Sequence, residues 1–235
     1  MQSARRHALL EALFASAIVT GLVTAASALL PERMVATGVG FVFLAATWLL
    51  VWRRDDADVE RAGLSFGGLV LPGRLDLGRA ARDAGLALAW ALAFAAIFFA
   101  PFYLGWRMWW HAEGAFSLVV QPAEIANTVF GQLVIIALPE EAFYRGYLQT
   151  RLDDVWPPGL RVLGAPVGPG ILVASVVFAL GHVATIHAPA RLAVFFPALV
   201  FGWLRARTGG IGASVVFHAA CNVFSEALGR GYGLY

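Results

Sequence analysis

Long runs of apolar residues constrain the fold of this chain more than any other feature of its sequence. A run of about 20 apolar residues is long enough to cross the hydrocarbon core of a bilayer as a helix. Seven candidate runs are present, at roughly 8–30, 34–52, 83–104, 123–151, 168–187, 190–205 and 210–229. The sequence therefore predicts an all-α, polytopic membrane helical bundle with about seven transmembrane helices, within a range of six to eight.

The composition supports a membrane protein and excludes several other classes. The chain is 60% hydrophobic and 14% charged, whereas ordinary soluble domains carry about 25% charged residues. Its net charge of +2 is too small to indicate a nucleic-acid partner. The single cysteine, Cys221, excludes an internal disulfide and any multi-cysteine metal site. All 17 basic residues are arginine, which together with the Ala and Gly content hints at a bacterial protein.

The arginines also predict how the bundle lies in the membrane, since cytoplasmic loops are enriched in basic residues. One side of the predicted bundle receives twelve of them: Arg5, Arg6, Arg53, Arg54, Arg61, Arg74, Arg79, Arg82, Arg151, Arg161, Arg205 and Arg207. The other side receives four, Arg33, Arg107, Arg191 and Arg230. This bias predicts a bacterial inner (plasma) membrane protein with a cytoplasmic N-terminus and an external C-terminus. No small-residue cleavage site ends the first run, so we expect it to be a retained helix.

Two adjacent carboxylates and an arginine lie at the end of the apolar run that begins near residue 125. Glu141 and Arg145 are four residues apart with the acid first, the favourable order for an ion pair on a helix. Glu140 lies about 100° around the same helix and is therefore the less satisfied acid. Pro139 removes one helical hydrogen bond and favours a kink. A paired acid beside a free acid is one way to hold a general base in a membrane. The alternative is that these polar side chains only hold neighbouring helices together.

Three further polar side chains lie inside the later runs. His182 follows Phe178 by four residues, and His218 precedes Asn222 by four, so the last two share a helix face. At about 1.5 Å per helical residue, Glu140, His182, His218 and Asn222 all lie roughly 12 to 20 Å above the predicted cytoplasmic ends of their helices. Structural polar groups scattered at random would not share a depth, so this coincidence favours a site.

Several mechanisms can be compared with these residues. A membrane zinc protease needs His-Glu-x-x-His, which is absent, and the aspartates of an aspartyl mechanism lie in loops here. Ser214 precedes His218 by four residues, but no glycine-flanked serine motif surrounds it. Of the mechanisms compared, hydrolysis by water that a carboxylate activates remains. Glu140 would take a proton from water, His182 would help to hold that water, and Asn222 would donate to the developing oxyanion.

The segments Glu140-Glu-Ala-Phe-Tyr-Arg145-Gly, Phe178-x-x-x-His182 and His218-x-x-x-Asn222, in this order, resemble the CAAX-protease and bacteriocin-processing family of intramembrane endopeptidases. This family includes the Ras-converting prenyl-protein endopeptidases. The resemblance covers roughly residues 123–229. It implies that Glu140 activates water with His182 as its partner, that His218 and Asn222 stabilise the oxyanion or orient the site, and that Glu141 and Arg145 support it.

The resemblance also implies a membrane-anchored protein or peptide as the substrate, within the lipid bilayer. The small size and arginine-rich composition look more like the myxosortase-like branch, which trims C-terminal sorting tails. We expect one integral membrane domain over residues 1–235, with N-terminal helices and a loop in 1–122 and the catalytic core in 123–229. We expect no cofactor; the alternative is a zinc ion bound by Glu140, His182 and His218.

Two functions from other classes stay open at this point. A non-proteolytic membrane scaffold or immunity protein would keep the polar cluster for folding, and a proton-coupled transporter would use glutamate and histidine layers as a relay. The presence of both Glu140 and His182 favours an enzyme over a scaffold. The absence of a visible repeat among the apolar runs argues against a transporter.

Overall fold

The computed structural model describes residues 2–71 and 75–234, so Arg74 lies outside the described residues. The N-terminal part consists of helices α1 (Gln2–Leu29), α2 (Glu32–Thr47) with its π-helical extension η1 (Trp48–Trp52), α3 (Asp56–Arg61), the turn η2 (Phe66–Gly68) and α4 (Leu77–Trp110). One long helical path follows, made of α5 (Pro122–Phe130), η3 (Gly131–Ala137), α6 (Leu138–Glu141), η4 (Ala142–Gln149) and α7 (Thr150–Val155). The chain ends with the hairpin β1 (Leu160–Val162) and β2 (Ala165–Val167), then α8 (Pro169–Thr185), η5 (Pro189–Val194), α9 (Phe195–Thr208) and α10 (Gly212–Gly231).

The predicted all-α membrane bundle is confirmed. Within the described ranges, five helical stretches are long and apolar enough to cross a membrane: Arg5–Leu29, Glu32–Trp52, Leu77–Trp110, Pro122–Val155 and Pro189–Thr208. Two predicted spans differ from these in character. Helix α8 is apolar but has only 17 residues, and α10 has 20 residues but carries His218, Asn222, Glu226 and Arg230. These two helices hold predicted site residues, and polar side chains lower the apolarity of α10.

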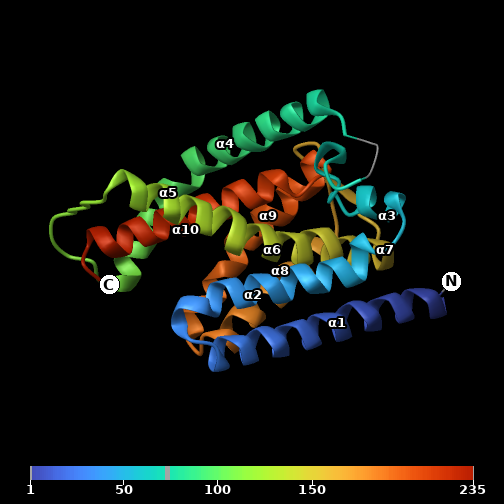
Figure 1. The fold of residues 1–235 in the computed structure, drawn as a ribbon, viewed down its shortest axis with the longest axis horizontal. Helices are drawn as coiled ribbons and strands as arrows, with labels where there is room; N and C mark the ends of the chain where they lie inside the picture. Colours follow the sequence, from blue (N-terminus) through green and yellow to red (C-terminus); the bar gives the residue numbers. More distant parts are fainter. Residues whose placement is uncertain (1, 72–74, 235) are drawn as a thin grey trace.

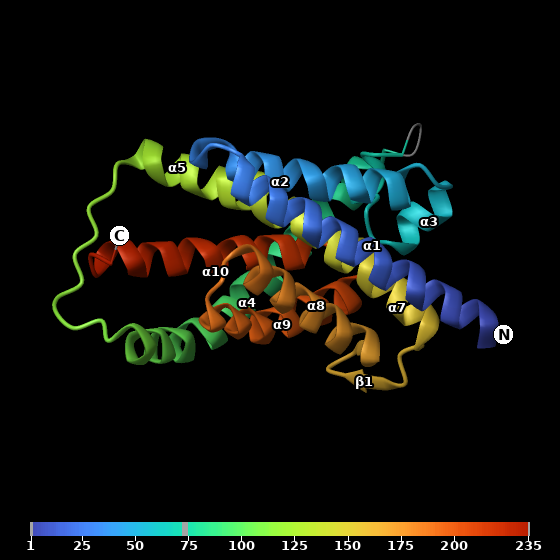
Figure 2. The same ribbon diagram turned by 90° about the horizontal axis from the view of Figure 1, so that it is seen from below.

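The long helices run back and forth along one axis, so their connections gather at two ends (Figures 1 and 2). The N-terminus, the segment between η1 and α4, the hairpin and the α9–α10 turn lie at one end, which we call the arginine-rich end. Eleven described arginines lie in these segments or in the helix ends next to them: Arg5, Arg6, Arg53, Arg54, Arg61, Arg79, Arg82, Arg151, Arg161, Arg205 and Arg207. The α1–α2 turn, the α8–α9 connection and the C-terminus face the opposite way, and we call this the C-terminal end. This arrangement agrees with the predicted partition of the arginines between two sides.

The helical path from α5 to α7 lies at the centre of the bundle. It is contacted by α2 on one side and by α8, α9 and α10 on others, while α1 packs on α2, α7 and α8. Pro139 does not break this path, because the helix widens to π geometry in η3 and η4 on either side of it. A π segment changes the direction in which the following side chains point and is common at functional sites. The eight side chains of η4 are all buried.

Candidate active site

Glu141 holds the most buried part of the predicted site together. Its side chain is fully buried, and its Oε1 accepts hydrogen bonds from Arg145 Nη1 at 3.0 Å and from His218 Nδ1 at 2.9 Å. Arg145, also buried, donates in addition to the carbonyl oxygen of Ala198 in α9 at 3.1 Å. The predicted ion pair between Glu141 and Arg145 is therefore confirmed, and it joins η4 to α9 and α10. A charge at this depth requires such partners, because an unpaired buried ion is strongly unfavourable.

Glu140, the neighbouring acid, has a different environment. It is 8% exposed, and its Oε2 has no hydrogen-bond partner among the described residues. His218 Nε2 lies 3.9 Å from that oxygen. Since His218 Nδ1 must carry the hydrogen donated to Glu141, the ring is oriented with Nε2 towards Glu140. The expectation that Glu140 is the less satisfied carboxylate is confirmed.

Aromatic rings separate these polar groups from lipid. Phe178 lies 4.4 Å from the ring of His182 and 5.8 Å from that of His218, measured between centroids. Phe201 stacks on His218 at 4.7 Å with an interplanar angle of 14°. The guanidinium carbon of Arg145 lies 4.6 Å from the centroid of Phe178, a favourable cation–π distance. This low-polarity surrounding strengthens the electrostatic interactions within the cluster.

His182 lies on the same cavity as Glu140. Its Nδ1 is 3.0 Å from the carbonyl oxygen of Phe178, one helical turn earlier. A carbonyl only accepts, so Nδ1 carries the hydrogen and Nε2 of the neutral ring is left as an acceptor. Glu140 and His182 both line a cavity of about 120 Å³, which α1, α2 and the end of α8 also border. The sequence-based expectation that these two residues share a depth agrees with this arrangement.

Asn222 lies one turn beyond His218 on α10 and belongs to a second set of polar side chains that are hydrogen-bonded to one another. Its Nδ2 donates to Gln132 Oε1 at 2.9 Å, and Gln132 Nε2 donates to Glu226 Oε2 at 3.3 Å. Glu226 in turn accepts from Arg230 at 2.6 Å. The described contacts thus connect Asn222 to η3 rather than to Glu140 or His182. One Nδ2 hydrogen of Asn222 remains for another acceptor.

Several residues at this site were not predicted from the sequence. Tyr144 borders the cavity and is buried, next to Thr20 of α1. Gly181 lies against Tyr144: a Cβ atom there would be 2.8 Å from the tyrosine hydroxyl. Tyr144 follows Glu140 by four residues, which was a usable signal because the two share a helix face. Thr20 and Gln132 carry no local pattern that distinguishes them from other polar residues in apolar helices.

The alternative zinc site can be compared with this geometry. Nitrogen and carboxylate donors are suitable zinc ligands, and Glu140, His182 and His218 supply them. Among the described residues, however, no group of three or more His, Cys, Asp or Glu side chains is arranged to hold a metal ion. The Nδ1 atoms of both histidines are already hydrogen-bonded. These residues do not form a ready three-ligand set.

One comparison with known proteins identifies the central part of the chain. Residues 122–224 match the family model described as Rce1-like, type II CAAX prenyl endopeptidase Rce1-like. No curated protein and no solved structure matches the sequence. The matched segment, slightly less than half of the chain, runs from α5 into α10 and contains Glu140, Glu141, Arg145, His182, His218 and Asn222. The chain is therefore an integral membrane protein whose residues 122–224 are similar to the type II CAAX prenyl endopeptidase family.

Proposed function

We propose that this protein is an intramembrane endopeptidase in which Glu140 activates water to hydrolyse a peptide bond. The observation that carries the proposal is the contrast between two adjacent carboxylates. Glu141 is fully buried and its Oε1 accepts from both Arg145 and His218, whereas Glu140 borders a cavity and its Oε2 has no partner in the described part of the chain. A general base needs a free lone pair within reach of the proton it removes.

In the proposed reaction, Glu140 accepts a proton from water while the water oxygen attacks the carbonyl carbon of the scissile bond. The Nε2 acceptor of His182 would hold the second hydrogen of that water. The tetrahedral intermediate then collapses with cleavage of the C–N bond, and Glu140 returns the proton to the leaving nitrogen. The carbonyl oxygen gains charge in this step and requires donors nearby.

His218 and Asn222 are the proposed donors to that oxygen. When His218 carries hydrogens on both ring nitrogens, Nδ1–H is held by Glu141 at 2.9 Å and Nε2–H faces the Glu140 side of the site. This arrangement resembles the carboxylate–histidine pairs that orient an imidazole in other hydrolases. Asn222 would contribute its second amide hydrogen. We propose no metal for these steps.

The proposed substrate is a membrane-anchored protein or peptide, with C-terminal sorting tails as the favoured class. The small, arginine-rich chain supports the myxosortase-like branch over enzymes of prenylated proteins. We further propose that the arginine-rich end faces the cytoplasm of a bacterium, so that the N-terminus is cytoplasmic and the C-terminus external. The positive-inside rule supports this orientation.

Cleavage of membrane-tail peptides in liposomes tests the mechanism. We expect wild type to be active with a chelator present, and Glu140→Gln and His182→Ala to lose about 10²- to 10⁴-fold or more in kcat, the usual contribution of general acid–base groups. Both variants should melt within a few degrees of wild type, since neither residue holds the Glu141–Arg145 pair.

Other outcomes identify other functions. Cleavage abolished by chelator and restored by zinc would replace the glutamate mechanism with a metal-dependent one. Full activity in Glu140→Gln would reject Glu140 as the base. If the natural substrate is included and remains intact, the scaffold or immunity function is favoured. Proton uptake coupled to a solute, lost in Glu140→Gln, would favour the transporter.

A further inference from the structure

The cavity at Glu140 lies towards one end of the bundle only. Its outer lining comes from Thr20 and Val23 in the second half of α1, Val39 in the first half of α2, and Thr185 and Ile186 at the end of α8. All these segments lie towards the C-terminal end, where α1 turns into α2 and α8 ends (Figure 2). The cavity that Glu140 borders therefore has its lining segments on the side of the C-terminal end.

The path from Glu140 towards the arginine-rich end is filled by tightly packed side chains. Phe143, Leu148 and Leu152 follow Glu140 along the same helical path and are 0% exposed, and Tyr147 is 1% exposed. Leu64, between α3 and η2, closes over this layer and touches the position of Gly146, with its side-chain atoms 3.0 Å from a Cβ built there. A peptide could not cross this layer without unpacking the core, which is strongly unfavourable.

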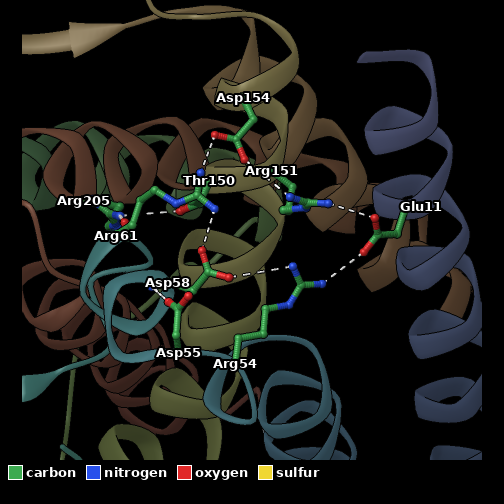
Figure 3. Close-up of polar contacts among 9 residues, drawn as sticks. All are labelled: Glu11, Arg54, Asp55, Asp58, Arg61, Thr150, Arg151, Asp154 and Arg205. Atoms are coloured by element: carbon green, nitrogen blue, oxygen red, sulfur yellow. Dashed lines mark hydrogen bonds and ion pairs between the residues drawn. The ribbon is translucent and has the colours of Figure 1, made fainter. Parts of the chain in front are cut away.

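Ion pairs cover the same end from outside. Glu11 in α1 accepts from Arg151 of α7 at 2.8 Å and from Arg54 at 3.3 Å. Arg61 in α3 pairs with Asp154 at 2.9 Å, and Arg205 of α9 donates to the Arg61 carbonyl oxygen at 2.6 Å. Figure 3 shows these side chains pointing towards one another from four separate segments. They join α1, α3, α7 and α9 at this end.

We propose that the substrate reaches Glu140 from the C-terminal end of the bundle, opposite the arginine-rich end. This inference rests on the proposed function. Under the proposed orientation the substrate comes from the external side, so it is an exported membrane protein whose cleaved segment lies in the outer half of the bilayer. A cytoplasmic protein carrying a lipid at its C-terminus would approach from the closed end.

The lining also indicates which peptide segment fits. Val23, Val39, Phe43 and Ile186 are apolar, while Thr20 and Thr185 add hydroxyl groups. Ionisable lining atoms belong to Glu140, Tyr144 and His182, all at the inner part. An extended, uncharged segment with apolar side chains matches these walls, and the hydroxyls can bond its backbone. A basic residue next to the scissile bond would lose its hydration without gaining a partner other than Glu140.

Cysteine labelling in sealed vesicles of known orientation tests the direction of access. In a Cys221→Ser background, Thr185→Cys marks the cavity mouth, Ala57→Cys in α3 marks the arginine-rich end, and Ser117→Cys between α4 and α5 marks the C-terminal end. A membrane-impermeant thiol reagent should modify Thr185→Cys and Ser117→Cys from the same side, and Ala57→Cys only from the other. Modification of Thr185→Cys from the Ala57 side, or from neither side, would overturn the proposal.

A protection experiment links this access to the substrate. In Thr185→Cys with Glu140→Gln, an apolar membrane-tail peptide should slow labelling several-fold, and the same peptide with arginines flanking its centre should not. Equal labelling rates with and without the apolar peptide would contradict the proposed path. Labelling needs no catalysis, so failure of the peptidase assay with normal labelling would reject the proposed function and leave the direction of access standing.

Discussion

At the scale of single residues, the site depends on what surrounds identical side chains. Glu140 and Glu141 are adjacent glutamates on one helix, yet Glu141 is fully buried with two cationic or imidazole partners and Glu140 borders the cavity. The helical repeat turns the second carboxylate into the core and leaves the first beside the cavity. One residue type thereby has two environments, and in the proposed reaction Glu141 gives support while Glu140 carries out the chemistry.

Arg145→Ala should lower the stability of the protein more than Arg54→Ala. Arg145→Ala leaves Glu141 buried without its cation, and such a loss typically costs about 3 to 5 kcal/mol. Arg54→Ala is the matched control, because its pair with Glu11 is at least one-third exposed on both sides and such pairs contribute about 0 to 1 kcal/mol. Thermal melting in detergent measures both. Equal melting temperatures for the two variants would show that the buried pair is not a structural support.

At the scale of elements, side-chain hydrogen bonds join α10 to η3. His218, Asn222, Glu226 and Arg230 recur every four residues on α10, and so lie along one face of it. Gln132 of η3 faces this row and bonds both Asn222 and Glu226. Because Glu226 can only accept, the amide nitrogen of Gln132 points to it and the amide oxygen points to Asn222. The orientation of the Asn222 amide is thus set by η3.

Gln132→Leu should therefore lower kcat more than it changes KM. The variant leaves the Asn222 amide without its acceptor and free to rotate, at a stability cost of about 1 to 3 kcal/mol for a buried unsatisfied group. Gln149→Leu is the matched control, since Gln149 lies on the same helical path within the packed layer beyond Glu140. Its side chain donates to the Gly202 carbonyl oxygen at 3.1 Å. Both variants should melt lower than wild type, but only Gln132→Leu should lose kcat beyond that effect. A parallel loss in Gln149→Leu would point to general destabilisation.

At the scale of the whole molecule, the two ends of the bundle differ in charge and packing. The arginine-rich end is closed by ion pairs and buried apolar side chains, and the C-terminal end receives the cavity. Under the proposed orientation, the side of the membrane with fewer arginines is also the side from which the substrate would reach Glu140.

A reporter fused to the C-terminus tests this orientation in a bacterial membrane. Alkaline phosphatase becomes active only outside the cytoplasm, so a C-terminal fusion should be active and the same enzyme inserted after Ala57 should be inactive. The reason is the excess of arginines in the segments around α3, which resist translocation. The opposite pattern would place the cavity mouth on the cytoplasmic side and change the expected substrate from exported to cytoplasmic proteins.

The local sequence determined most of the helices and those parts of the candidate site that lie within a single helix. Apolar runs of sufficient length required helices in lipid, since these satisfy their own backbone groups, and the spacing of four predicted the Glu141–Arg145 pair that the structure contains. The spacing of His218 and Asn222 likewise placed them on one face of α10. These features depend only on the helical repeat, which is a property of neighbouring residues.

Only the tertiary structure decided which groups meet across the bundle. Glu141 and His218 are 77 residues apart, and Asn222 and Gln132 are 90 apart, so neither bond follows from periodicity. Thr20 and Gly181 reach the cavity because α1 packs on α8, and the closed end forms because Glu11 meets Arg151 of α7. Helix packing fixes these distances through the shapes of many side chains at once, and that information is not contained in any single segment.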